Sequence, residues 1–137
     1  MTTHTGQCLC GDVCYTLAGE PIATAICHCK NCQRQSGSTF SLVVIARTSK
    51  ITSVGNLKTY MDTAESGAAL ERCFCPECGS PVFSRQPVSP GITVIKAGTF
   101  DDTTWLQPQL HIWCDSAQSW LNMSDGLPHF AKNAPSG

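Results

Sequence analysis

Long apolar runs are missing from this sequence. No stretch of the 137 residues approaches the roughly 18 consecutive apolar residues of a membrane-spanning helix. Residues 1–6 are polar and no apolar run follows them, so the pattern of a secretory signal is absent. We therefore expect a cytoplasmic protein with no membrane partner.

Charge is also scarce. Charged residues make up 14% of the chain, with nine Lys and Arg against ten Asp and Glu, for a formal net charge of −1. The cations are scattered, with no basic tail or stripe, which argues against a nucleic-acid partner. Internal repeats and low-complexity tracts are absent too. The length and a hydrophobic content of 42% predict one globular domain, residues 1–137.

Cysteine, by contrast, is abundant, with ten residues in the chain. In the reducing compartment that we expect, so many thiols indicate metal binding rather than disulfides. Seven of them form three close groups, and three are left over. The groups are Cys8/Cys10, Cys27/Cys29/Cys32 and Cys75/Cys78, and the others are Cys14, Cys73 and Cys114. We expect Cys14 and Cys114 to be buried as small apolar side chains.

The spacing of the thiols predicts how they could share metal ions. Cys75-x-x-Cys78 followed by Gly79 is typical of a zinc knuckle, in which the glycine relieves backbone strain. Cys8 and Cys10 lie two residues apart in what reads as an extended segment, so both sulfurs could complete that site.

The triplet Cys27, Cys29 and Cys32 would then hold a second ion and leave one position for water or an incoming thiol. Spacing alone leaves two alternatives open. The triplet could join Cys75 and Cys78 in one site, or it could recruit His28 as a fourth ligand.

Several polar residues are candidates for roles around the triplet. His28, Arg34 and Ser36 flank it and could orient a thiol substrate, or they could support the ligands and face solvent. His111 and Trp113 would share one strand face, for which a core role is the default and pocket lining the alternative. Lys96 ends an apolar strand, and we expect it to be solvated rather than catalytic.

Many short β-rich segments separated by Gly and Pro predict an all-β fold with at most short helical turns. Three local predictions can be compared with a structure. They are a helical turn at 30–35 ended by Gly37, two strands at 51–54 and 57–60 joined by a tight turn at Gly55-Asn56, and a short helix at 116–121 anchored by Trp120.

Six motifs follow one another along nearly the whole chain. They are GQCLCG at 6–11 with Val13 and Tyr15, CHCKNC at 27–32, FCPECGSPVF at 74–83, AGTFDD at 97–102, HIW at 111–113 and DGLP at 125–128. In this order the motifs resemble the glutathione-dependent formaldehyde-activating enzyme family, which also includes centromere protein V.

This resemblance implies a small zinc-stabilised, tent-like β-sandwich holding about two zinc ions. It implies a structural zinc on Cys8, Cys10, Cys75 and Cys78, and a catalytic zinc on Cys27, Cys29 and Cys32. The implied activity is that of a carbon–sulfur lyase, which joins a small thiol such as glutathione to an aldehyde such as formaldehyde, or cleaves the adduct. The alternative is a zinc-stabilised binding module without catalysis, which leaves the three-thiol site unexplained.

Overall fold

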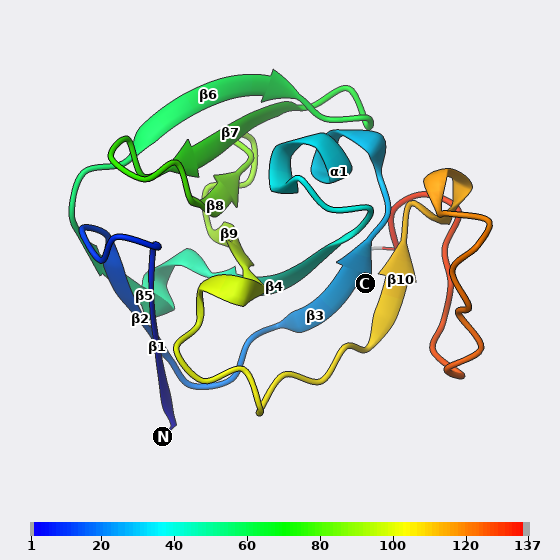
Figure 1. Cartoon of the computed structure of the whole chain (residues 1–137), viewed down its shortest axis with the longest axis horizontal. Helices are drawn as coiled ribbons and strands as arrows, with labels where there is room; N and C mark the ends of the chain where they lie inside the picture. Colours follow the sequence, from blue (N-terminus) through cyan, green and yellow to red (C-terminus); the bar gives the residue numbers. More distant parts are fainter. Residues whose placement is uncertain (1, 136–137) are drawn as a thin grey trace.

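The computed structural model describes residues 2–135, which form ten short strands, one α-helix and three 3₁₀ turns. Figure 1 shows their arrangement. The strands are β1 (Thr3–Gln7), β2 (Cys14–Ala18), β3 (Ala23–Cys27), β4 (Ser41–Arg47), β5 (Ile51–Val54), β6 (Lys58–Thr63), β7 (Ala69–Phe74), β8 (Pro81–Arg85), β9 (Ile92–Lys96) and β10 (Leu110–Ile112). The helix is α1 (Lys30–Ser36), and the 3₁₀ turns are η1 (Thr48–Lys50), η2 (Ala97–Thr99) and η3 (Cys114–Ser116).

The strands form two sheets. The small sheet has the order β1-β2-β5, and the large sheet has the order β10-β3-β4-β9-β8-β7-β6. Their pairings are antiparallel except for β10, which runs parallel to β3. The β6–β7 arm of the large sheet curves over α1 (Figure 1). The all-β prediction is confirmed, and no helix within residues 2–135 is long and apolar enough to cross a membrane.

The hydrophobic core lies between the two sheets. Tyr15 and Leu17 alternate with the exposed Thr16 on β2, so both point inward. Tyr15 meets Phe83 of the large sheet edge-on, with ring centroids 5.2 Å apart. Val44 on the central strand β4 is fully buried in the same cluster.

The predicted helical turn is confirmed as α1, and its ends have local causes. The Cys29 sulfur accepts a hydrogen bond from the Cys32 backbone N–H at 3.2 Å and caps the start of the helix. Gly37 adopts φ +70° at the end, where its N–H bonds the carbonyl of Gln33.

The two strands predicted at 51–54 and 57–60 are confirmed as β5 and β6, but the hairpin that would pair them with each other is wrong. β5 pairs with β2 in the small sheet, whereas β6 pairs with β7 in the large sheet. Gly55 has φ +100°, and a Cβ there would lie 2.1 Å from the carbonyl oxygen of Asp12. The Gly-Asn pair is therefore a crossing between sheets and not a hairpin turn.

The predicted helix at 116–121 is also wrong. The chain forms η3 and then becomes extended at Ala117, and Trp120 is 66% exposed. Polar contacts with α1 hold this segment instead. The Gln33 amide donates to the carbonyl of Ser116 at 3.2 Å, and the Gln118 amide donates to Gln33 at 3.0 Å.

Candidate metal centres and the adjoining cavity

The first cluster contains four thiols from two distant turns. Cys8 and Cys10 follow β1, while Cys75 and Cys78 lie between β7 and β8, and their sulfurs all lie within 4.8 Å of one another. The sulfur of Cys10 is 3.6 Å from that of Cys8 and 3.7 Å from that of Cys75. Cys8 and Cys10 belong to a turn, closed by a Gly11 N–H bond to the Cys8 carbonyl, and not to an extended segment as expected.

Backbone geometry fixes the second of these turns. Gly79 has φ +79°, which favours glycine, and its N–H bonds the Cys75 carbonyl at 2.8 Å. The Ser80 hydroxyl links both turns, since it accepts from the Leu9 N–H and contacts the Cys78 sulfur at 3.3 Å. Hydrogen bonding to Ser80 lowers the pKa of Cys78 to about 5, which suits a thiolate ligand.

The second cluster contains the three thiols of the triplet, whose sulfurs also lie within 4.8 Å of one another. Cys27 ends β3, Cys29 caps α1, and Cys32 lies in the first turn of the helix. The seven grouped thiols thus divide into four and three. His28 is absent from both groups of donor atoms.

Among the three thiols of the triplet, that of Cys32 has the lowest pKa. Hydrogen bonds from Cys27 and Cys29 lower the pKa of Cys32 to about 2, and the positive charges of Lys96 and Arg72 act in the same direction. The pKa of Cys27 is raised, chiefly by its hydrogen bonds with the other two thiols. Both clusters offer closely spaced sulfurs without a disulfide among the described residues, and this donor chemistry fits zinc.

A cavity of about 190 Å³ adjoins the triplet. Its wall combines the three thiols with apolar side chains and a few charged groups. The apolar and aromatic members are Val43, Ile45, Leu70, Val94, Ile112 and Trp113, and the charged members are Glu65, Arg72 and Lys96. Such a site can shelter a small reactant from water while presenting charge to it.

Trp113 reaches this cavity because it lies outside the regular strand. It follows β10, has φ +58° and precedes η3, so strand alternation with His111 does not apply. Its indole N–H donates to Asn133 at 2.8 Å. Of the pair His111 and Trp113, only Trp113 lines the cavity, so the default core role was wrong for that residue.

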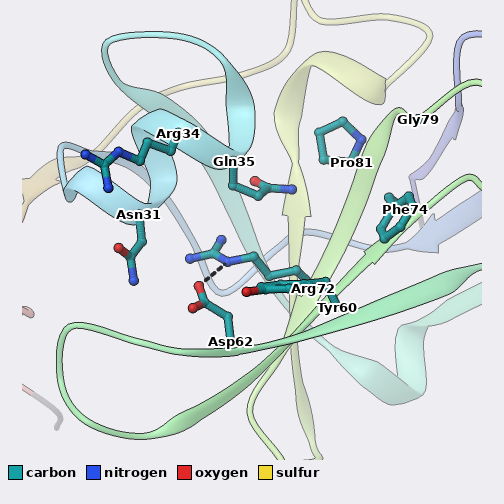
Figure 2. A pocket seen from close by; sticks show the side chains of 9 residues that line it. All are labelled: Asn31, Arg34, Gln35, Tyr60, Asp62, Arg72, Phe74, Gly79 and Pro81. Carbon is teal, nitrogen blue, oxygen red and sulfur yellow. Dashed lines mark hydrogen bonds and ion pairs between the residues drawn. The ribbon is translucent and has the colours of Figure 1, made fainter.

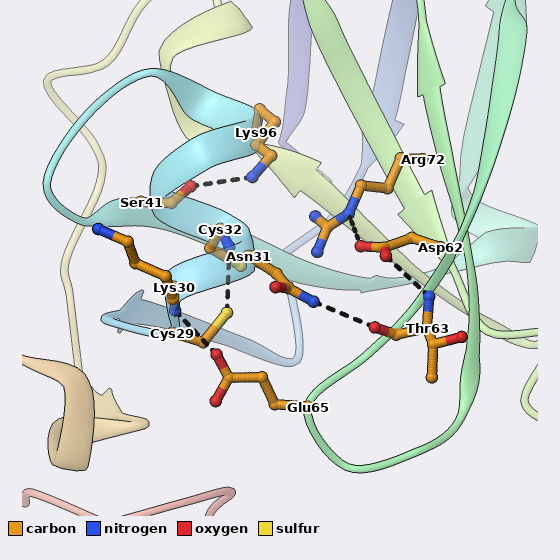
Figure 3. Close-up of polar contacts among 10 residues, drawn as sticks. All are labelled: Cys29, Lys30, Asn31, Cys32, Ser41, Asp62, Thr63, Glu65, Arg72 and Lys96. Carbon is orange, nitrogen blue, oxygen red and sulfur yellow. Dashed lines mark hydrogen bonds and ion pairs between the residues drawn. The ribbon is translucent and has the colours of Figure 1, made fainter.

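Lys96 is buried, with 6% of its surface exposed, and the expectation of solvation was wrong. It pairs with Val43 where β9 adjoins β4, inside the sheet. Its ammonium donates to the Ser41 hydroxyl at 3.0 Å (Figure 3). Burial lowers the pKa of Lys96, and the negative charge of Cys32 opposes that shift.

Arg72 is the second buried cation of the wall. Its Nε donates to a carboxylate oxygen of Asp62 at 2.8 Å (Figure 3). Burial opposes the charged form, but the hydrogen bond to Asp62 raises the pKa of Arg72 overall.

The tip of the β6–β7 hairpin covers the cavity. Ala64, Glu65 and Ser66 lie in its wall. A Glu65 carboxylate oxygen accepts from the Lys30 backbone N–H at 2.9 Å, and the Asn31 side chain donates to the Thr63 carbonyl at 3.1 Å (Figure 3). These two contacts join the hairpin to the start of α1.

A wider groove of about 570 Å³ adjoins the cavity (Figure 2). Asn31 and Arg72 line both spaces. The groove is otherwise lined by Arg34, Gln35, Tyr60, Asp62, Phe74, Gly79 and Pro81. Arg34, one of the candidate flanking residues, therefore faces this groove and does not line the thiol cavity.

His28 and Ser36, the other two candidates, also lie outside the cavity wall. The Ser36 hydroxyl donates to the Gln33 carbonyl at 3.4 Å and accepts from the Ser38 N–H at 3.3 Å, at the end of α1. Cys14 and Cys114 join neither thiol cluster, as expected, but both are half-buried and not fully buried.

A hydrogen-bonded chain runs from the buried His28 to Asp125. His28 Nε2 lies 2.9 Å from His111 Nδ1, and His111 Nε2 lies 2.7 Å from the Asp125 carboxylate. The carboxylate accepts a hydrogen bond from the His111 Nε2–H, so in the neutral imidazole of His111 the Nδ1 accepts one from the His28 Nε2–H. This bond lowers the pKa of Asp125 to about 2. Sequence reasoning missed this chain, which depends on the pairing of β10 with β3.

The chain was compared with known proteins. A family model described as glutathione-dependent formaldehyde-activating enzyme matches residues 3–116. Proteins of Talaromyces marneffei and Aspergillus flavus, provisionally named after the same family, are each 26% identical to it, over 80% and 74% of this chain. The matches span 60% and 56% of those relatives, so this chain covers less than two thirds of their length.

A crystal structure of a Rhodobacter sphaeroides protein shows the same fold. It has a TM-score of 0.54 and 19% identity, and the match covers 92% of this chain and 98% of that one. At this identity the likeness concerns the fold alone.

Proposed function

The chain belongs to the glutathione-dependent formaldehyde-activating enzyme family, and from this premise we propose that it is a zinc-dependent carbon–sulfur lyase. It would form or cleave the adduct between a small thiol and an aldehyde, with glutathione and formaldehyde as the leading pair. The observation that carries the proposal is the three-thiol cluster beside a cavity of about 190 Å³.

We propose the ligands as the thiol groups divide them. Cys8, Cys10, Cys75 and Cys78 would hold a structural zinc, because four thiolates leave no open position. Cys27, Cys29 and Cys32 would hold the catalytic one. Zinc bound there supplies an open position for an incoming thiol and lowers the pKa of that thiol.

The protein side chains would position the thiol and exclude water from the reacting groups. The apolar cavity wall keeps water from the reacting groups. The adjoining groove offers Arg34 and Asn31 to the polar tail of the thiol. In the reaction the thiol sulfur bonds to the carbonyl carbon and the C=O π bond breaks. The proton of the thiol ends on the oxygen, so the product is a hemithioacetal.

Exchange NMR of formaldehyde with its thiol adduct tests this function. Because the uncatalysed addition is rapid, the zinc-loaded protein must raise the exchange rate above background with glutathione or smaller thiols. Cys29→Ser should abolish the excess and reduce the metal content from about two zinc ions to about one. Cys114→Ser, which changes a thiol outside both clusters, should leave exchange and metal content unchanged.

Absence of any excess rate over the whole thiol panel would refute catalysis. A single tightly held zinc ion together with that result would favour the binding module instead.

A further inference from the structure

Within residues 2–135, Lys96 lacks the carboxylate partner that a buried cation ordinarily has. Its hydrogen bond goes to the neutral hydroxyl of Ser41. Within residues 2–135 no carboxylate lies within ion-pair distance of its ammonium. Arg72, on the same cavity wall, is already paired with Asp62. A buried charge is costly unless an opposite charge lies near it. Among the described residues that charge comes from the triplet sulfurs and not from a carboxylate, so Lys96 is suited to an anion inside the cavity.

Two kinds of anion can face Lys96 in the cavity: a thiolate sulfur, and the oxygen of an aldehyde that a thiolate has attacked. The triplet thiols lie in the cavity wall with Lys96, and their charge acts on its ammonium. When a thiolate adds to an aldehyde, its negative charge moves from the sulfur to the carbonyl oxygen. That oxygen is bonded to the carbon that receives the sulfur, so it must lie close to the triplet, where Lys96 is directed (Figure 3).

We propose that Lys96 is a catalytic residue, whose ammonium donates a hydrogen bond to the carbonyl oxygen as it becomes an alkoxide. This inference rests on the proposed function and adds a residue to it. The sulfur–carbon bond forms, the electron pair of the C=O π bond moves to oxygen, and the proton released by the thiol returns to that oxygen. Lys96 keeps its own proton, and no oxidant or reductant is needed.

The surroundings of Lys96 favour this role. Its backbone is fixed between β4 and β8 in the large sheet, which limits its movement. Ser41, on the neighbouring strand, holds the ammonium at 3.0 Å and leaves two further N–H donors for a ligand. A donor placed before the reaction avoids the cost of reorganisation while the charge develops.

Two stable probes separate sulfur binding from oxygen binding. Ethanethiol presents sulfur alone, whereas thioacetate carries sulfur and oxygen on the same carbon, as the alkoxide does. Calorimetry of the zinc-loaded protein gives a dissociation constant for each. Lys96→Met should weaken thioacetate relative to ethanethiol by roughly 10- to 100-fold compared with the wild type, since a charge-assisted hydrogen bond is lost. Taking this ratio cancels the intrinsic acidity of the two probes.

Controls keep the test decisive. Lys58→Met makes the same change on the exposed face of β6 and should leave the ratio unchanged. Zinc content and circular dichroism report whether Lys96→Met folds. Lys96→Gln, which can still bond Ser41, serves as the second variant and should show the same loss.

The ratio of the two dissociation constants tests the role of Lys96, whereas the exchange rate tests the proposed lyase function. An unchanged ratio in Lys96→Met and Lys96→Gln would overturn the role of Lys96, even if the wild type accelerates exchange. If the Lys96 variants lose the wild type's preference for thioacetate over ethanethiol, the contact with oxygen is supported. This holds even if no thiol in the panel is turned over, in which case only the proposed lyase function fails. Where the wild type does turn over, the Lys96 variants should lose kcat by at least about tenfold.

Discussion

At the scale of single residues, the bond between His111 and Asp125 makes stability depend on pH. The Asp125 carboxylate receives the His111 Nε2–H, and this bond lowers its pKa to about 2 from a usual 3.8. A carboxyl group with a depressed folded-state pKa stabilises the fold fully above its unfolded-state pKa. That contribution disappears as pH falls through the folded-state value, so the window lies between about 4 and about 2.

Asp125→Asn should therefore destabilise the protein at pH 5 and have progressively less effect as pH falls toward 2. Asparagine can still accept the hydrogen bond, but without the charge that strengthens it. Urea unfolding of both proteins at each pH measures the difference. Asp115→Asn, which removes an exposed carboxylate 3.3 Å from Lys132, is the control. A difference between wild type and Asp125→Asn that stays constant across the window would contradict the prediction.

Sequence spacing anticipates residues whose partners are near in the chain. Cys29 and Cys32 lie three apart, and one caps the helix that carries the other. Lys96 was misjudged because its burial depends on β4, about 50 residues away in the chain. The same reason applies to His111, whose contact with His28 requires a parallel strand pair.

Among the elements, the crossing at Gly55 gives a prediction about stability. Gly55 and Gly67 both have positive φ, yet only Gly55 is crowded, with a Cβ position 2.1 Å from the Asp12 carbonyl oxygen. Gly67→Ala should cost about 1–2 kcal/mol of unfolding free energy from backbone strain alone. Gly55→Ala should cost more than about 3 kcal/mol, because backbone must also move. If chemical denaturation shows that Gly55→Ala and Gly67→Ala lose the same unfolding free energy, the crowding of Gly55 against Asp12 does not affect stability.

The β6–β7 hairpin gives a second prediction at this scale. Its Glu65 carboxylate accepts a hydrogen bond from the Lys30 N–H at 2.9 Å and lies in the cavity wall. Glu65→Ala should speed zinc extraction from the triplet several-fold, because the hairpin tip opens more often. A chromogenic chelator should resolve two release phases, of which the one from the four-thiol site stays unchanged. Glu20→Ala, which changes a carboxylate outside both clusters and outside the cavity wall, should alter neither phase. An unaltered triplet phase in Glu65→Ala would exclude the role of this contact.

Elements with local causes were predicted better than those with distant ones. Helix α1 has both of its capping residues within its own segment, Cys29 and Gly37. The 51–60 segment carries a hairpin-like Gly-Asn pair, but its two strands find better partners in β2 and β7. Strand pairing is set by packing across the fold, which no short window contains.

For the whole molecule, the two thiol clusters have different structural consequences. The four-thiol cluster joins the turn after β1 to the turn between β7 and β8, so it links the small sheet to the large one. The triplet draws all its thiols from residues 27–32, on the large-sheet side. A metal bound to the four-thiol cluster should therefore stabilise the packing of the small sheet against the large one. A metal at the triplet should stabilise mainly the residues around the cavity.

Hydrogen exchange of Cys78→Ser and Cys29→Ser tests this division. Loss of a ligand from the four-thiol site should raise amide exchange in β1 and β2 by at least about 100-fold, because structural zinc commonly supplies much of the folding free energy of a small domain. Strands β4 and β9 should keep more protection, since each pairs on both sides within the large sheet. Cys29→Ser should leave β1 and β2 protected while it releases the other ion. If both variants raise exchange in β1 and β2 equally, the clusters do not divide their roles. If neither variant raises it, the small sheet is held by the packing of the shared core, to which Tyr15 and Leu17 belong.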